Sequence, residues 1–98
     1  MNNARRKAIQ AVIESLKEIP VTDIVGSIED AKATLEEICE EEQEAYENMP
    51  ESIQYGEKGE AAQEAINNLE YADNELYELS SFLERLDEAV SYLEEAQA

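Results

Sequence analysis

The side chains of this sequence that could do chemistry are mainly carboxylates, together with a single thiol, Cys39. General acid and base catalysis usually needs a group that titrates near neutral pH, and the chain has no histidine to supply one. The six serines have no plausible base partner in the sequence. Neighbouring glutamates disfavour a thiolate, so we expect Cys39 to be a buried structural thiol. These residue types predict a protein that is not an enzyme and needs no cofactor.

Rows of glutamate offer oxygen ligands to hard cations. The densest row contains Glu37, Glu40, Glu41 and Glu44. Di-iron sites in helical bundles also require the pattern Glu-x-x-His, which this chain lacks, and Glu42 is the one carboxylate predicted to face the core. We therefore expect loose association with Ca²⁺ or Mg²⁺ at most, and no specific metal site.

Charge sets the class of partner. The chain has 98 residues, 43% of them hydrophobic, and a net charge of −18. Its length and apolar content predict one folded, soluble domain over residues 1–98. The acidic field repels phosphates and anionic membranes, so we expect a basic protein as partner and neither direct nucleic acid binding nor membrane binding.

The lone cysteine excludes an internal disulfide and favours a reducing compartment. The basic start of the chain precedes an apolar segment, but polar residues interrupt that segment too early for a signal sequence. No stretch approaches the roughly 20 apolar residues of a membrane span. We expect a cytoplasmic protein.

The elements that would position these groups are helices. Apolar spacing predicts helices at about 3–19, 22–48 and 58–97, with a turn at 49–59. The first helix should end at Pro20, which cannot donate the next helical hydrogen bond. Its basic start, residues 5–7, opposes the helix dipole and predicts an electrostatic contact with an acidic helix elsewhere.

Heptad numbering, with Ile28 at position a of the helix at 22–48 and Ala62 at position a of the helix at 58–97, organises the two longer helices. Position a contains Val21, Ile28, Leu35, Glu42, Met49, Ala62, Leu69, Leu76, Leu83 and Val90, and position d contains Ile24, Ala31, Ile38, Ala45, Ala65, Ala72, Leu79, Leu86 and Leu93. Apolar residues at e and g widen this stripe beyond the seam of a two-stranded coil. We therefore predict an all-α fold: an antiparallel helical hairpin with a long C-terminal helix and an N-terminal helix, forming a three-helix bundle or a coiled-coil dimer.

The turn has its own local signals. Pro50 suits the first turn of a short helical segment, and Gly56 suits an end with positive φ. Gly59 would then release the chain into the long helix. Ile53 and Tyr55 are left either to plug the end of the bundle or to capture a partner.

The run EEEQEAYENMPESIQYGEKGEAAQEAINNLEYA, residues 40–72, resembles small acidic helical proteins of bacteriophages and other mobile elements. The shared features are the acidic lead-in, the NMPES turn, the Gly59-Glu60 pair and the following run of Ala and Glu. The resemblance covers about a third of the chain. It implies origin more than activity, with the host cytoplasm as the expected location if a phage encodes the chain, and it assigns no functional residue.

The predicted outer surface combines carboxylates with aromatic rings. The candidate partner-binding residues are Glu37, Glu40, Glu41, Glu44, Tyr71, Tyr77 and Tyr92, with Ile53 and Tyr55 at the turn. Rigid carboxylate rows with exposed rings can imitate nucleic acid and attract a basic groove. The sequence thus predicts a non-enzymatic, phage-type accessory protein that binds a macromolecule through this surface, including as a nucleic-acid mimic.

Other functions fit the same residues. In one alternative, the charged face only keeps a bundle soluble, and the tyrosines pack under the first helix. A hydrophobic flank can hold a partner helix as an adaptor does. The main alternative is a structural, homo-oligomeric coiled-coil protein whose long helix is the assembly surface.

Overall fold

The computed structural model describes residues 1–97, and the all-α prediction is confirmed there. Its helices are α1 (Asn3–Lys17), α2 (Val21–Glu47), α3 (Glu51–Gln54) and α4 (Glu57–Ala96). The three predicted helices differ from the observed ones by one or two residues at their ends. The short α3 lies within the predicted turn.

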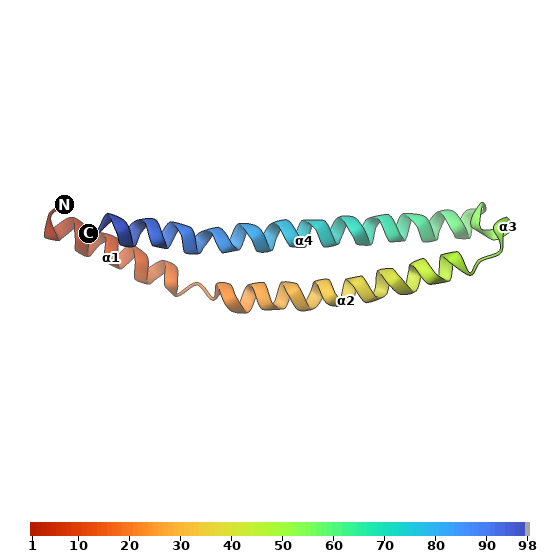
Figure 1. Cartoon of the computed structure of the whole chain (residues 1–98), viewed down its shortest axis with the longest axis horizontal. Coiled ribbons are helices and arrows are strands. Elements are labelled where there is room, and N and C mark those ends of the chain that lie inside the picture. Colours follow the sequence, from red (N-terminus) through yellow and green to blue (C-terminus); the bar gives the residue numbers. More distant parts are fainter. Residues whose placement is uncertain (98) are drawn as a thin grey trace.

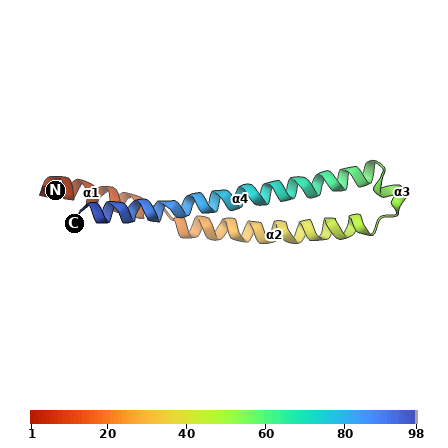
Figure 2. The same ribbon diagram turned by 45° about the horizontal axis from the view of Figure 1, so that its top comes forward.

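The helices form a rod in which α4 is the common partner. In Figure 1, α2 runs antiparallel to α4, and α1 continues the line of α2 along the C-terminal part of α4. The Cα atoms extend over 75 × 18 × 15 Å. Each level of the rod therefore contains two helices. A three-helix bundle does not form within residues 1–97, because α1 lies end to end with α2 and not beside it (Figures 1 and 2).

The contact between α2 and α4 uses heptad positions a and e, not a and d. The less exposed residues of α2 are Val21, Val25, Gly26, Ile28, Lys32, Leu35, Cys39, Glu42 and Tyr46, with Met49 just beyond its end, and those of α4 up to Leu83 are Gly59, Ala62, Ala65, Ile66, Leu69, Asp73, Leu76, Ser80 and Leu83. The predicted d residues are mostly exposed, including Ile24, Ile38 and Leu79. The apolar stripe is wider than one partner helix can cover, so pairing along one edge leaves the other edge open.

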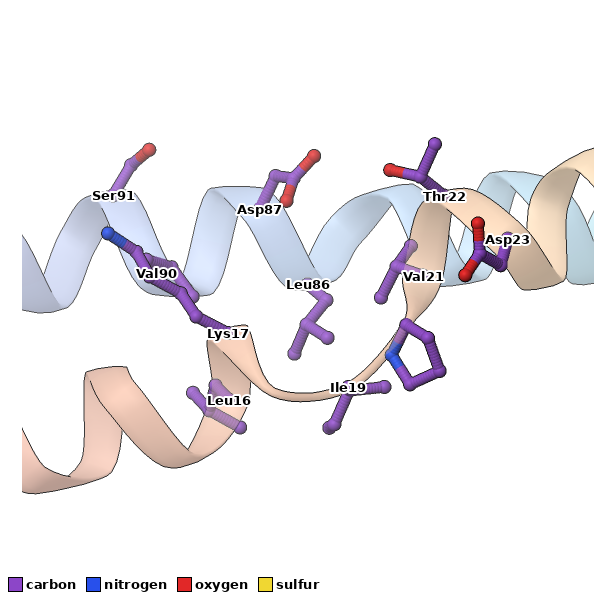
Figure 3. A pocket seen from close by; sticks show the side chains of 11 residues that line it. Leu16, Lys17, Ile19, Val21, Thr22, Asp23, Leu86, Asp87, Val90 and Ser91 are labelled. Atoms are coloured by element: carbon purple, nitrogen blue, oxygen red, sulfur yellow. The ribbon is translucent and has the colours of Figure 1, made fainter.

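The face of α4 that makes contacts changes at the level of the bend between α1 and α2. Beyond Leu83, the less exposed residues of α4 are Leu86, Val90 and Leu93, which lie at a and d and cover α1. Figure 3 shows Leu86 projecting from α4 toward the bend that carries Ile19. The break at Pro20 lets α1 follow this rotated face, which a continuous straight helix would not do.

Polar contacts hold α1 against the end of α4. The Arg6 side chain donates a hydrogen bond to the backbone carbonyl of Gln97 (3.1 Å), and the Gln97 amide donates to the Gln10 side chain (2.8 Å). Lys17 forms an ion pair with Glu94 at 3.1 Å. The basic start of α1 therefore meets the C-terminal end of α4, where the helix dipole favours a cation, and Arg6 binds a carbonyl there instead of an acidic side chain.

Few side chains are fully covered. The buried apolar residues are Ile13, Ala62, Ile66 and Val90, which gather toward the two ends of the rod. Between them, Lys32 and Asp73 lie in the seam, with Nζ and Oδ2 3.7 Å apart. The Asp73 Oδ1 and Ser80 hydroxyl oxygens are buried without a hydrogen-bond partner. The middle of the hairpin is thus a partly polar contact.

The turn differs from its prediction in detail. Gly56 has φ −98°, so α3 does not end in a left-handed glycine. Gly59 lies inside the first turn of α4 and is buried, because α3 crosses close to it and a Cβ there would overlap the Gln54 carbonyl oxygen. The Gln54 side chain donates to the Tyr46 carbonyl oxygen (3.0 Å) at the end of α2, which also accepts from the Met49 backbone N–H (3.1 Å). Close packing of α3, and not backbone freedom, explains Gly59.

Candidate functional site

Carboxylates cover the side of the hairpin that the seam leaves to solvent. We call the exposed residues at heptad positions b, c and f of α2 and α4 the acidic surface. Its carboxylates are Asp23, Glu29, Asp30, Glu36, Glu37, Glu40, Glu44, Glu47, Glu57, Glu60, Glu64, Glu70, Glu78, Glu84, Glu88 and Glu95. Arg85 is its one interrupting cation within α2 and α4, apart from Lys58 near the turn. The surface follows the hairpin from end to end.

The predicted site residues occupy different parts of this surface. Glu37 and Glu44 lie at position c of α2, which points directly away from α4 on an a/e seam, and Glu40 lies next to them. Glu41 is at position g, so it lies outside the acidic surface, on the same side of α2 as Ile38. Whether these glutamates bind a partner stays a prediction.

Two of the three predicted tyrosines lie on the opposite edge. Tyr71 and Tyr92 are at position c of α4 and are 66% and 72% exposed. They are therefore not packed beneath α1. Position c of α4 points away from α2, so Glu37 and Tyr71 mark opposite edges of the hairpin. A partner must wrap around the rod to touch both.

Tyr77 lies beside the seam, on the side of the hairpin where residues of α2 and α4 line a shared groove. The Lys32 ammonium lies over its ring, 5.0 Å from the centroid, which is cation–π distance. Glu29 and Glu84 line the same shallow groove as this pair. Although Lys32 covers one part of the ring, Tyr77 is 63% exposed.

A second groove on this side brings carboxylates of both helices together. Glu36 of α2 and Glu70 of α4 line it, together with Cys39 and Asp73. Cys39 is half-buried, whereas the sequence predicted a buried thiol. Sequence reasoning left Glu29, Glu36, Glu70 and Glu84 out of the candidate set. Their shared position b was the signal that could have grouped them.

The groove at the bend between α1 and α2 has mixed chemistry. Figure 3 shows Lys17 on one side of it, with Asp23 and Asp87 on the other. Leu86 and Val90 form its floor, and Ser91 lies at its edge. The polar groups point outward, so this groove presents no converging set of reactive side chains.

The turn residues are placed at the tip of the rod. Ile53 is 40% exposed and Tyr55 is 80% exposed, so neither plugs the end of the hairpin. Both remain available for a contact, and their predicted role in capturing a partner stays a prediction.

Within residues 1–97, no three cysteine, aspartate or glutamate side chains converge as metal ligands would. None of the helices in this part of the chain has the length and apolar character needed to cross a membrane. No family model matches the chain, and neither a curated protein nor a solved structure is significantly similar to it.

Proposed function

We propose that this protein is a non-enzymatic binding protein whose acidic, tyrosine-bearing helical surface holds a basic protein partner, in the manner of a nucleic-acid mimic. The observation that supports it is the continuous acidic surface along a 75 Å rod, with Tyr71, Tyr77 and Tyr92 exposed on it. The proposed role as an accessory protein of a mobile element is supported by the resemblance of residues 40–72 to small acidic phage proteins.

The density of charge supports mimicry. A net charge of −18 over 75 Å is about one negative charge per 4 Å of rod, close to the roughly 3.4 Å per phosphate of a single nucleic acid strand. Helices keep these charges at fixed spacing, whereas a disordered acidic tail would not. A basic groove shaped for a strand would therefore meet a similar field here.

The tyrosines add the second feature of a strand. Proteins that bind single strands stack aromatic side chains on the bases and track the backbone with cations. Tyr71 and Tyr92 offer free rings beside carboxylates on the outer edge of α4. Arginine side chains of a partner can stack on such rings while their charge faces the neighbouring glutamates.

Charge reversal tests this proposal. The variant Glu37→Lys, Glu40→Lys and Glu44→Lys changes the outer edge of α2, and the matched control Glu14→Lys, Glu18→Lys and Glu51→Lys changes net charge equally outside the acidic surface. Each protein is immobilised and exposed to a bacterial lysate at low salt. We expect the wild-type chain and the control to retain basic proteins that a single-stranded DNA oligonucleotide elutes. We expect the first variant to lose most of them.

The outcomes separate the proposal from bulk charge. If both variants lose the retained proteins equally, net charge and not this surface is responsible. If DNA elutes nothing that salt elutes, mimicry is wrong. Binding should also weaken steeply between about 50 and 200 mM salt, since ions screen contacts between exposed charges.

A further inference from the structure

A stripe free of most charge runs along the side of the hairpin opposite the shared grooves. We call the residues at positions d and g of α2 and α4 the apolar stripe. Its exposed apolar members are Ile24, Ala31, Ile38, Ala45, Ala61, Ala72, Leu79, Phe82, Ala89 and Ala96, whereas Ala65 is half-buried and Leu86 and Leu93 are half-buried where α1 packs against α4. Ile38, Leu79 and Phe82 are 44%, 47% and 67% exposed. Large apolar side chains thus lie in line on one side, not scattered.

The stripes of α2 and α4 lie on the same side of the hairpin. Glu36 and Glu70, both at position b, line one groove, so the b positions of the two helices share a side. The d and g positions flank the opposite edge of each a/e contact, as antiparallel pairing requires. Ile19, Phe82 and Leu86 line an apolar groove on that side, at the end next to α1.

Acidic residues are nearly excluded from this side. Helices α2 and α4 contain 22 of the chain's 25 acidic residues, and only Glu41 and Glu75 occupy positions d or g. A surface that merely kept the rod soluble would have no reason to separate charge in this way. The separation matches the depletion of charge at the centre of protein interfaces.

The exposed area indicates what should cover the stripe. A compact monomer of 11.0 kDa would expose about 5,600 Å², whereas this chain exposes 7,396 Å². The excess, about 1,800 Å², is well above the roughly 800 Å² that each partner buries in a standard stable interface. A chain this open lacks about one interface worth of cover.

We propose that the apolar stripe is the dimer interface, where two hairpins stack stripe to stripe in opposite directions to form a four-helix rod. The stripe has bulky residues toward α1, such as Leu79 and Phe82, and alanines toward the turn, such as Ala45 and Ala65. Antiparallel stacking sets the bulky end of one copy on the small end of the other. The acidic surfaces then lie on the two outsides of the dimer, as far apart as the fold permits.

Glu75 is the costly residue of this arrangement. It lies near the middle of α4, so the two-fold axis of a centred antiparallel dimer passes close to it and brings two like charges together. Its replacement by leucine should therefore strengthen the dimer, whereas loss of Phe82 should weaken it. These opposite signs are specific to the stripe.

The mass of the chain in solution, measured by sedimentation equilibrium over a range of concentrations, tests the proposal. We expect twice the chain mass of 11.0 kDa for the wild-type chain. Phe82→Glu should raise the dissociation constant of the dimer at least about a hundredfold, because it buries a charge at the interface. Its control is Tyr92→Glu, an equally exposed aromatic on the acidic surface, which should change little.

Glu75→Leu covers the case in which Phe82→Glu fails to fold. It should tighten the dimer about tenfold by removing like-charge repulsion, and Glu78→Leu at position c is its control. A wild-type monomer, equal effects at Phe82 and Tyr92, or no tightening by Glu75→Leu would each overturn the proposal. The proposal is independent of the proposed function, since Phe82→Glu should still retain basic proteins and the reversed glutamates of α2 should leave a dimer.

Discussion

The turn end of the hairpin and its middle are built differently. At the turn, α3 packs over the start of α4, and Gly59, Ala62 and Ile66 are buried. In the middle, no side chain is buried, and Lys32 and Asp73 replace apolar contacts. Three segments meet at the turn and only two helices meet in the middle. At the turn, cover from a third segment, more than the apolar pattern itself, accounts for the buried residues.

The largest loss of stability should come from Ile66→Ala at the turn end. Ile66 is 2% exposed, and truncating such a side chain leaves a cavity as well as losing buried area. We expect a loss of about 2–5 kcal/mol in the free energy of unfolding. Urea denaturation followed by circular dichroism, at one protein concentration, measures it.

The matched control is Ile53→Ala, the same change at a side chain that is 40% exposed and lies outside the apolar stripe. It should cost clearly less. Equal losses at the two positions would mean that burial of Ile66 is not the source of the effect.

A smaller effect should follow from adding one methyl group at the turn. Gly59→Ala places a Cβ against the α3 backbone, so α3 must move, and we expect a loss of about 1–3 kcal/mol. Gly26→Ala is the opposite case, because nothing lies within 4 Å of its Cβ position and alanine is the better helix former. It should gain about 0.5–1 kcal/mol. Thermal denaturation of both variants checks the two signs.

The smallest effect is expected in the middle. Lys32 and Asp73 are part-exposed, at 17% and 27% of their side chains, so their ion pair is weak. The double variant Lys32→Leu and Asp73→Leu should unfold at the same urea concentration as the wild-type chain or at a higher one, because it also removes the unpartnered Asp73 oxygen. A double-mutant cycle with both single variants measures the coupling. A marked loss in the double variant would show that the polar middle is needed for pairing.

The sequence was sufficient for the helices and for position a. Proline at 20 and 50 and the long unbroken apolar period set the bounds, and Leu35, Leu69 and Leu76 lie in the seam as predicted. The prediction of d as the second seam position was wrong, because the contact uses position e. Position e has polar residues such as Asp73 and Ser80, and an apolar pattern favours d over such an edge. Rotation of a helix pair depends on how the turn joins the two helices, which the pattern does not contain.

The candidate site was predictable in composition but not in arrangement. Exposed tyrosines and carboxylates follow from the heptad numbering, and Tyr71, Tyr77 and Tyr92 are exposed. The candidate glutamates and tyrosines lie on opposite edges of the hairpin because the seam uses positions a and e. The predicted a/d seam could not give this arrangement. Glu41 shows the consequence, since a shift from d to e moves position g from the flank of the seam to the side of the apolar stripe.

The break at Pro20 allows the two parts of the rod to unfold independently. Helix α1 has 15 residues, a length at which an isolated helix is marginal in water, so it depends on α4 to stay folded. Because α1 and α2 share no continuous hydrogen-bond ladder across the bend, α1 can open while the hairpin stays paired. Amide protons of α1 and of the last turns of α4 would then exchange by local opening. The rod is one long helix, α4, with the two shorter helices α1 and α2 packed end to end along it. Of these two, α1 is the one expected to detach first.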